Sequence, residues 1–214
     1  METLNYEVLK KSGYNGYIKE SAPEKVMQFG EGNFLRAFVD YFFDCANEKA
    51  DWNGKVVLVQ PIAQGLTKLI NDQEGLYTLY LRGSEKGEKV DLKRVISSVS
   101  RCINPYDDFD AVLELAKSDD LEYIVSNTTE AGIVHESESK FDQCPPISFP
   151  AKLTRVLYER YKAGKDGVVV LSCERSTTMV KNSRNVSTSN IDDWRLEEEF
   201  KHGSMRRTHS VLHW

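Results

Sequence analysis

The sequence has no long apolar run, no closely spaced cysteine pair and no surplus of basic residues. A membrane-spanning helix needs about 20 consecutive apolar residues, and no stretch approaches that length. The four cysteines (Cys45, Cys102, Cys144 and Cys173) are far apart, which suits free thiols in a reducing compartment better than a disulfide scaffold or a zinc site. The net charge of −5 gives no nucleic-acid footprint. We therefore expect a cytoplasmic protein with neither a membrane nor a nucleic-acid partner.

Histidine is also scarce, and three of the four histidines (His202, His209 and His213) fall near the end of the chain. Their spacing could place a pair on one helical face. Gly203 and Ser204 interrupt that segment, however, and no Asp, Glu or Cys lies between or after these histidines. We predict no metal site there, and we find no Ser–His–Asp arrangement to assign as catalytic.

What the chain does have is an alternation of strand-like and helix-like segments in 214 residues, 40% of them hydrophobic. The expected strands are 25–29, 55–60, 121–125 and 167–171, and the expected helices are 33–49, 104–116 and 149–162. Two further apolar segments, 76–82 and 90–99, flank a polar turn and indicate a hairpin. The order predicts an α/β fold of the Rossmann type, in which a doubly wound, mainly parallel sheet carries an antiparallel hairpin insertion near 76–99.

The most informative segment is 26–38, VMQFGEGNFLRAF, in which a short strand meets two glycines and a helix begins at once. A pyrophosphate binds to backbone N–H groups at a helix N-terminus, where the helix dipole is positive. A glycine allows that close approach because it has no Cβ. The third glycine of the GxGxxG pattern is replaced by Leu35, so we expect looser helix–strand packing there. An ordinary strand–helix turn is the alternative.

This segment closely resembles the N-terminal turn of the long-chain polyol and hexuronate dehydrogenases, the mannitol-dehydrogenase-like family. Four further stretches carry the resemblance in the same order: KVVLVQPI at 55–62, NDQEGLYTLYLRG at 71–83, VSNTTEAGI at 125–133 and VVVLSCE at 168–174. The resemblance implies an NAD-binding domain over 25–174 after a lead-in at 1–24. Members of the family also have a larger helical C-terminal domain with the substrate site and a catalytic Lys, which we expect to be absent from this chain.

The turn is where the resemblance places the cofactor. The residues assigned to cofactor binding there are Phe29, Gly30, Glu31, Gly32, Asn33, Phe34, Leu35 and Arg36. Arg36 lies one turn into the helix and could pair with phosphate, or it could be a solvated helix charge.

Two further positions complete the assigned cofactor site. An acidic residue often closes the second strand and binds the adenine ribose; here Gln60 stands there without a basic neighbour, which favours NAD over NADP. Gln60 could instead be a plain polar residue at a strand end. Asn127 and Thr128 follow the strand 121–125 and could bind the nicotinamide ribose or carboxamide, or form a helix N-cap cluster.

The composition changes after residue 174. Segment 175–190 is rich in Ser, Thr and Asn, contains few apolar residues and resembles nothing in the family. Segment 191–201 looks like an acidic amphipathic helix and resembles the family again, whereas the last 13 residues do not. We expect 175–214 to be a poorly ordered tail with one helix at 191–201. A change of reading frame with premature termination would explain the pattern.

The function implied by the resemblance is hydride transfer between NADH and the ketone of a hexuronate, a sugar-acid substrate. Another polyol or uronate dehydrogenase is the alternative within the family. A non-catalytic NAD(H)-binding module is the alternative outside it. Without the catalytic domain, we expect the chain alone to be inactive.

Overall fold

The computed structural model describes residues 2–129, 132–133, 138–173 and 177–207. Five strands form the main sheet: β1 (Glu24–Phe29), β2 (Lys55–Val59), β5 (Val99–Ile103), β6 (Tyr123–Ser126) and β7 (Val169–Ser172). The helices are α1 (Tyr6–Lys11), α2 (Asn33–Lys49), α3 (Thr67–Asp72), α4 (Phe109–Ala116), α5 (Phe149–Lys162), α6 (Thr177–Asp193) and α7 (Glu198–Arg207). No helix in these ranges is both long and apolar enough to cross a membrane.

The main sheet is parallel, with the order β5-β2-β1-β6-β7. The chain runs outward from β1 to β2 and β5, then returns to the other side of β1 for β6 and β7. This confirms the predicted Rossmann-type doubly wound sheet. The direction reverses between β1 and β6, where Phe29 lies level with Val59 and Ser126. The carboxyl ends of these strands therefore open onto one crevice.

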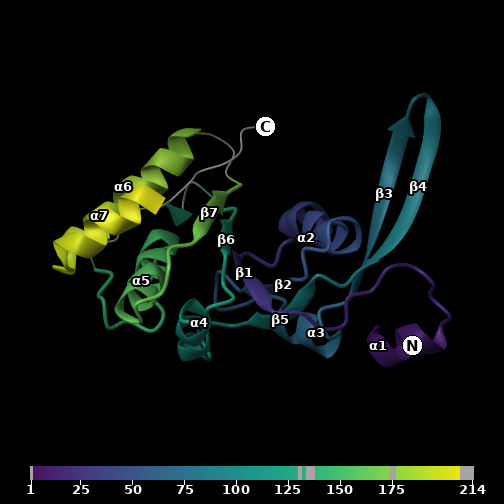
Figure 1. Cartoon of the computed structure of the whole chain (residues 1–214), viewed down its shortest axis with the longest axis horizontal. Helices are drawn as coiled ribbons and strands as arrows, with labels where there is room; N and C mark the ends of the chain where they lie inside the picture. The colour runs from purple at the N-terminus through teal and green to yellow at the C-terminus, as the bar shows by residue number, and fades with distance from the viewer. Residues whose placement is uncertain (1, 130–131, 134–137, 174–176, 208–214) are drawn as a thin grey trace.

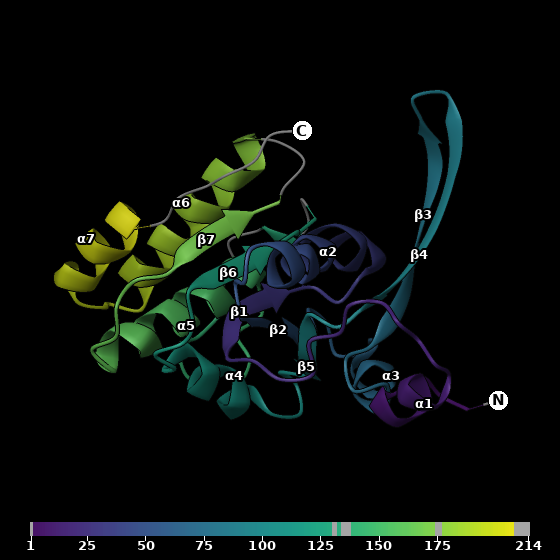
Figure 2. The same ribbon diagram turned by 45° about the vertical axis from the view of Figure 1, so that its right-hand side comes forward.

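Helices cover both faces of this sheet, as Figure 2 shows. On one face, Met27 and Phe29 pack with side chains of α4 and α5. On the other face, Val26 and Leu58 pack with side chains of α2 and α3. Strand β2 is buried along its whole length, as expected for a strand without polar alternation.

The predicted hairpin is present as β3 (Tyr77–Glu85) and β4 (Glu88–Ile96), paired antiparallel as a separate two-stranded sheet. It projects away from the body of the molecule (Figure 1). At its base, Leu76 and Val95 pack against Leu9 of α1. Its inner part is joined to α2, because the fully buried Asp44 accepts hydrogen bonds from Arg94 and Ser97.

Several predicted boundaries were wrong. Segment 90–99 is not one strand: β4 ends at Ile96 and β5 begins at Val99 as the third strand of the main sheet. The helix expected at 104–116 begins only at Phe109. Asn104 forms a turn with Asp107, and Asp108 caps the helix by accepting from the Ala111 N–H.

The segment expected to be a poorly ordered tail also differs from the prediction. Residues 177–193 form the regular helix α6, which packs along α5 (Figure 1). Two of its apolar side chains, Met179 and Ile191, are buried. The single helix expected at 191–201 is instead interrupted, because Arg195 has φ of +52° between α6 and α7. Residues 208–214 lie outside the described part of the chain, so the tail's last segment, with His209 and His213, is not placed.

Candidate functional site

The glycine turn between β1 and α2 forms the centre of the crevice. Gly30 has φ of +126°, a conformation that L side chains rarely adopt, and its N–H donates to Val59 O at 3.0 Å. A Cβ on Gly30 would lie 3.0 Å from Cδ1 of Leu35. Leu35 is buried and fills the space beneath the turn. The Leu35 side chain thus takes the place of a glycine contact, and the looser helix–strand packing expected there stays a prediction.

Gly32 has a different role, because a Cβ there would meet nothing within 4 Å. Gly32 is the N-cap of α2, and no side chain caps the helix. The first N–H groups of an α-helix have no partner within the helix. The open space at Gly32 thus lies beside the positive, uncapped end of a 17-residue helix, which is a suitable place for an anion.

Arg36 is held close to this helix end. Its Nη2 donates to Asn33 Oδ1 at 2.6 Å, and its guanidinium lies 5.2 Å from the centroid of the Tyr77 ring. The Tyr77 hydroxyl donates to the Arg36 carbonyl at 2.6 Å, and its oxygen lies 3.3 Å from Asp40 Oδ2. Arg36 is half-buried and fixed by the hairpin, so it is not the freely solvated charge of the alternative interpretation.

Asp40 is a fully buried carboxyl beneath the first turns of α2. Burial raises its pKa to about 7, and Asp44 adds to this, whereas the Tyr77 hydroxyl, Arg36 and Gln28 act in the opposite direction. A carboxyl with a raised pKa is protonated in the folded state where the unfolded chain is ionised. It therefore costs stability as the pH rises from about 4 to about 7.

Replacing Asp40 by Asn should stabilise the protein at pH 8, by on the order of 3 kcal/mol, and should have little effect near pH 4. Urea unfolding at both pH values measures the difference. An equal effect of the substitution at pH 4 and pH 8 would contradict the assignment of the titration to this carboxyl.

Gln60 directly follows β2, at the strand end where it was predicted, but its side chain is held by other groups of the protein. Only 2% of it is exposed; its Nε2 donates to Ile62 O at 2.7 Å, and its Oε1 accepts from the Thr67 hydroxyl at 2.7 Å. A Cβ on Gly65 would lie 2.4 Å from Glu31 Oε1 and 2.5 Å from Gln60 Oε1. Gln60 and Glu31 therefore support the loop after β2, and the Gln60 amide is not free to meet a ribose in this structure. The alternative interpretation, a polar residue at a strand end, describes it better.

A cavity of about 330 Å³ lies in the crevice, at the carboxyl ends of β1, β2 and β6. Phe29, Gly30, Asn127 and Thr128 all line it, so the structure brings together two separate groups of the predicted site residues. The side chain of Asn127 also donates to the carbonyl of Cys173, at the end of β7. Asn127 thereby links β6 and β7 at the edge of the cavity.

The sequence did not predict the rest of the cavity lining, on the side away from the glycine turn and the end of β6; we call this the far wall. Its members come from the loop after β2, the turn after β5 and the start of α5: Pro61, Ile62, Tyr106, Ile147, Phe149 and Lys152. Four of them, from Ile62 to Phe149, are large apolar or aromatic side chains that are distant in sequence, and the fold of the sheet brings them together. The Tyr106 hydroxyl donates to Pro61 O at 3.1 Å. No local motif signals this wall.

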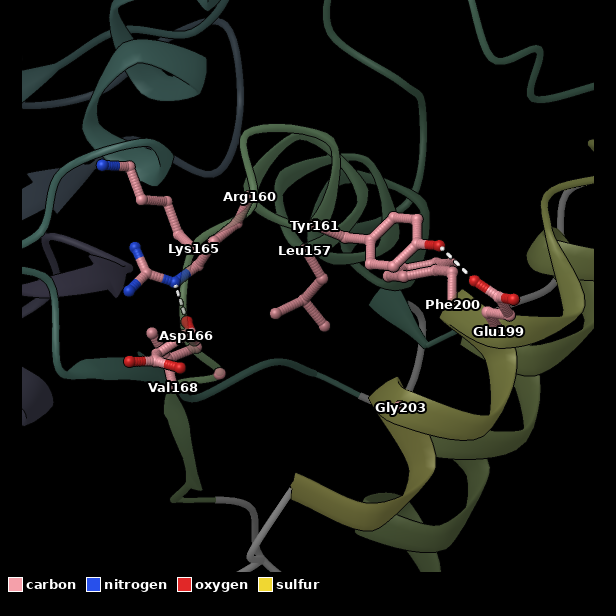
Figure 3. A pocket seen from close by; sticks show the side chains of 10 residues that line it. Leu157, Arg160, Tyr161, Lys165, Asp166, Val168, Glu199, Phe200 and Gly203 are labelled. Atoms are coloured by element: carbon pink, nitrogen blue, oxygen red, sulfur yellow. Dashed lines mark hydrogen bonds between the residues drawn. The ribbon is translucent and has the colours of Figure 1, made fainter.

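A second cavity, of about 270 Å³, lies between α5, α7 and the chain that leads into β7 (Figure 3). It is at the amino end of β7, away from the glycine turn. Its polar side chains already have partners: Arg160 donates to Asp166 O, and the Tyr161 hydroxyl to Glu199 Oε2. Within the described residues, no three His, Cys, Asp or Glu side chains gather as a metal site would require.

Comparison with known proteins identifies the family of this chain. The family described as "Mannitol dehydrogenase Rossmann domain" matches residues 24–203. The chain belongs to the mannitol dehydrogenase family. The match includes 175–190, the segment that was expected to resemble nothing in the family; the reading-frame explanation stays a prediction, which resequencing the gene tests.

Curated members of this family that match the chain include altronate oxidoreductases. That of Klebsiella pneumoniae is 46% identical over 179 residues, which are 81% of this chain and 35% of the relative. That of Phocaeicola vulgatus is 40% identical over 205 residues, 94% of this chain and 41% of the relative. The chain thus spans about two fifths of the length of these relatives.

Solved structures of two dehydrogenases share the fold. The mannitol 2-dehydrogenase of Pseudomonas fluorescens, in a ternary complex with NAD and D-mannitol, gives a TM-score of 0.77 at 18% identity, over 96% of this chain and 45% of that one. A substrate-free D-sorbitol dehydrogenase gives a TM-score of 0.70, also at 18% identity, over 89% of this chain and 42% of that one.

Proposed function

We propose that this chain is the NAD(H)-binding part of an oxidoreductase that transfers a hydride between NADH and a hexuronate ketone, the tagaturonate/altronate pair. The observation that carries the NAD(H) assignment is the uncapped N-terminus of α2 behind Gly30 and Gly32, at the point where the strand order reverses. Ligands of open α/β sheets bind at such points. The altronate oxidoreductases among the relatives support the choice of substrate.

Each part of the crevice has a task in this proposal. Backbone N–H groups from Gly32 to Leu35 bind the pyrophosphate, and the Arg36 cation lies one turn further along α2. Asn127 and Thr128 stand at the end of β6, where they can fix the nicotinamide ribose. NADH, when bound, supplies the hydride. The chain's own residues orient the dinucleotide and exclude water from its apolar side.

The reduction of a ketone also needs a group that stabilises the developing alkoxide. The site residues proposed here supply none. We propose that it lies in the part of the relatives that this chain does not span, together with the sugar-acid site. On this reading residues 25–174 are the cofactor domain, and the protein works in the cytoplasm. The exposed aromatic row on α2, with Phe34 and Phe42 at its ends, is a surface that further protein could cover.

The proposal predicts that the chain binds NADH about tenfold more tightly than NADPH, a difference of about 1.4 kcal/mol. The loop from Gln60 to Leu66 contains no Lys or Arg that could meet a 2′-phosphate at the end of β2. The chain should nevertheless consume no NADH with tagaturonate. Cofactor fluorescence measures the binding and absorbance at 340 nm the turnover.

These measurements also separate the alternatives. Turnover with a polyol or with fructuronate, but not with tagaturonate, would move the protein to another branch of the family. Binding without turnover, even when the remainder of a full-length relative is supplied, would favour a non-catalytic NAD(H)-binding module. Failure to bind NADH at all would overturn the proposed function.

A further inference from the structure

Lys152 is a buried cation in the wall of the crevice cavity. It lies in the first turn of the 14-residue helix α5, and only 3% of it is exposed. Its side chain lines the same cavity as Gly30 and Asn127. A charged group in such a position normally has a paired opposite charge, because burial of a lone ion is costly.

Lys152 has no such partner among the described residues. Its Nζ donates one hydrogen bond, to Ile147 O at 2.8 Å, and lies 5.4 Å from the centroid of the Tyr106 ring. An ammonium group has three donors, so two remain for a ligand. No carboxylate of the described chain forms an ion pair with it, and burial lowers its pKa to about 8.

The buried Lys55 provides an internal comparison. It is also 3% exposed, but it lies at the amino end of β2, and Nζ has three protein acceptors: Tyr6 Oη at 3.0 Å, Ser97 O at 2.7 Å and Val99 O at 3.4 Å. Burial lowers the pKa of Lys55 to about 8 as well, but Asp44, Glu20 and Glu24 oppose that shift, whereas no described carboxylate does so at Lys152. Lys55 is thus satisfied by the protein, and Lys152 is not.

The surroundings of Lys152 increase its need for an anion. The first turn of α5 contains no acidic residue, and the helix dipole is positive at that end. A cation on this turn is unfavourable for the free protein. It becomes favourable only when an anion enters the cavity from the crevice.

We propose that Lys152 is a phosphate-binding residue of the dinucleotide site. Lys152 and Gly30 of the glycine turn line the same cavity, so a phosphate that enters this cavity from the turn would meet the Lys152 cation. This inference rests on the proposed function and adds to it a residue that no motif of the cofactor turn contains. The pyrophosphate is one source of this chemistry and a 2′-phosphate is the other.

The test compares Lys152→Met, which keeps the stem and removes the charge, with Lys152→Arg, which keeps the charge. Lys162→Met is the matched control, because Lys162 lies on the same helix and is exposed and paired with Glu197. Each protein is titrated with NADH, NADPH, ADP-ribose and adenosine, and its melting temperature is measured without ligand.

Lys152→Met should lower the affinity for NADH and for ADP-ribose at least about tenfold and leave the affinity for adenosine unchanged. Its melting temperature should be equal to that of the wild type or higher, because an unpaired buried charge has been removed. Lys152→Arg should retain most of the affinity. A loss confined to NADPH would assign the residue to the 2′-phosphate. An equal loss for adenosine, or no loss for any phosphate ligand, would overturn the inference. If the wild-type chain binds no NADH, the proposed function fails instead.

Discussion

Replacing Gly32 by Val should abolish NADH binding without unfolding the protein. The loss should be at least about 100-fold, or about 2.7 kcal/mol, because the valine side chain would occupy the space in which we propose that the pyrophosphate meets the α2 amides. The fold should tolerate it, since a Cβ at Gly32 meets nothing within 4 Å and the backbone there is extended, with φ of −69°. NADH fluorescence and thermal unfolding of the same samples measure the two effects.

Two other glycines serve as controls. Gly83 of β3 also has open space around it, but it lies on the hairpin, so Gly83→Val should leave NADH affinity unchanged. Gly30→Val should instead destabilise the fold, because Gly30 has a positive φ and Leu35 lies beneath it. Unchanged affinity in the Gly32 variant would remove the turn from the cofactor site.

Replacing Asp44 by Ala should destabilise the protein by about 3–5 kcal/mol. Asp44 is fully buried. Its Oδ2 accepts from Arg94 Nε at 2.7 Å and its Oδ1 from the Ser97 N–H at 2.8 Å. Alanine would leave the largely buried Arg94 with Glu48 as its remaining carboxylate partner and the Ser97 N–H without an acceptor. The base of the hairpin should then separate from α2.

The control lies further out on the same hairpin. Asp91 pairs with Arg82 where both are well exposed, so Asp91→Ala should cost less than about 1 kcal/mol. Urea unfolding gives both values. Similar small losses for the two variants would mean that the hairpin is not held through Asp44.

Patterns of residues that are close in sequence were sufficient to predict the elements at the centre of the fold. The β1 turn and the start of α2 could be predicted because the glycines and the apolar spacing lie within 20 residues of one another. The buried run at 55–59 identified β2 because a strand covered on both faces needs no polar positions. The hairpin could be predicted for the same reason, since its strands are adjacent in sequence. The boundary between β4 and β5 could not, because only pairing with β2 separates them.

The far wall of the site depends on long-range contacts. Lys152 and Tyr106 meet only after α4, β6 and the start of α5 have packed on the sheet, and neither belongs to a recognisable motif. Gln60 was placed correctly at the end of a strand, but its burial depends on Thr67 and Gly65, which fold back over it. The helix over 177–193 was missed because its own composition is polar, and it is packing along α5 that provides its buried face.

The central claim is that the dinucleotide binds at the glycine turn, in the crevice at the carboxyl ends of β1 and β6. Titration of the ¹⁵N-labelled chain with NADH, followed through its backbone amide resonances, tests this most directly. We predict the largest shifts at the amides of Gly30, Gly32 and Asn33, with further shifts at Asn127 and Thr128. Shifts confined to the α5–α7 cavity, or no shifts at saturating NADH, would contradict the account.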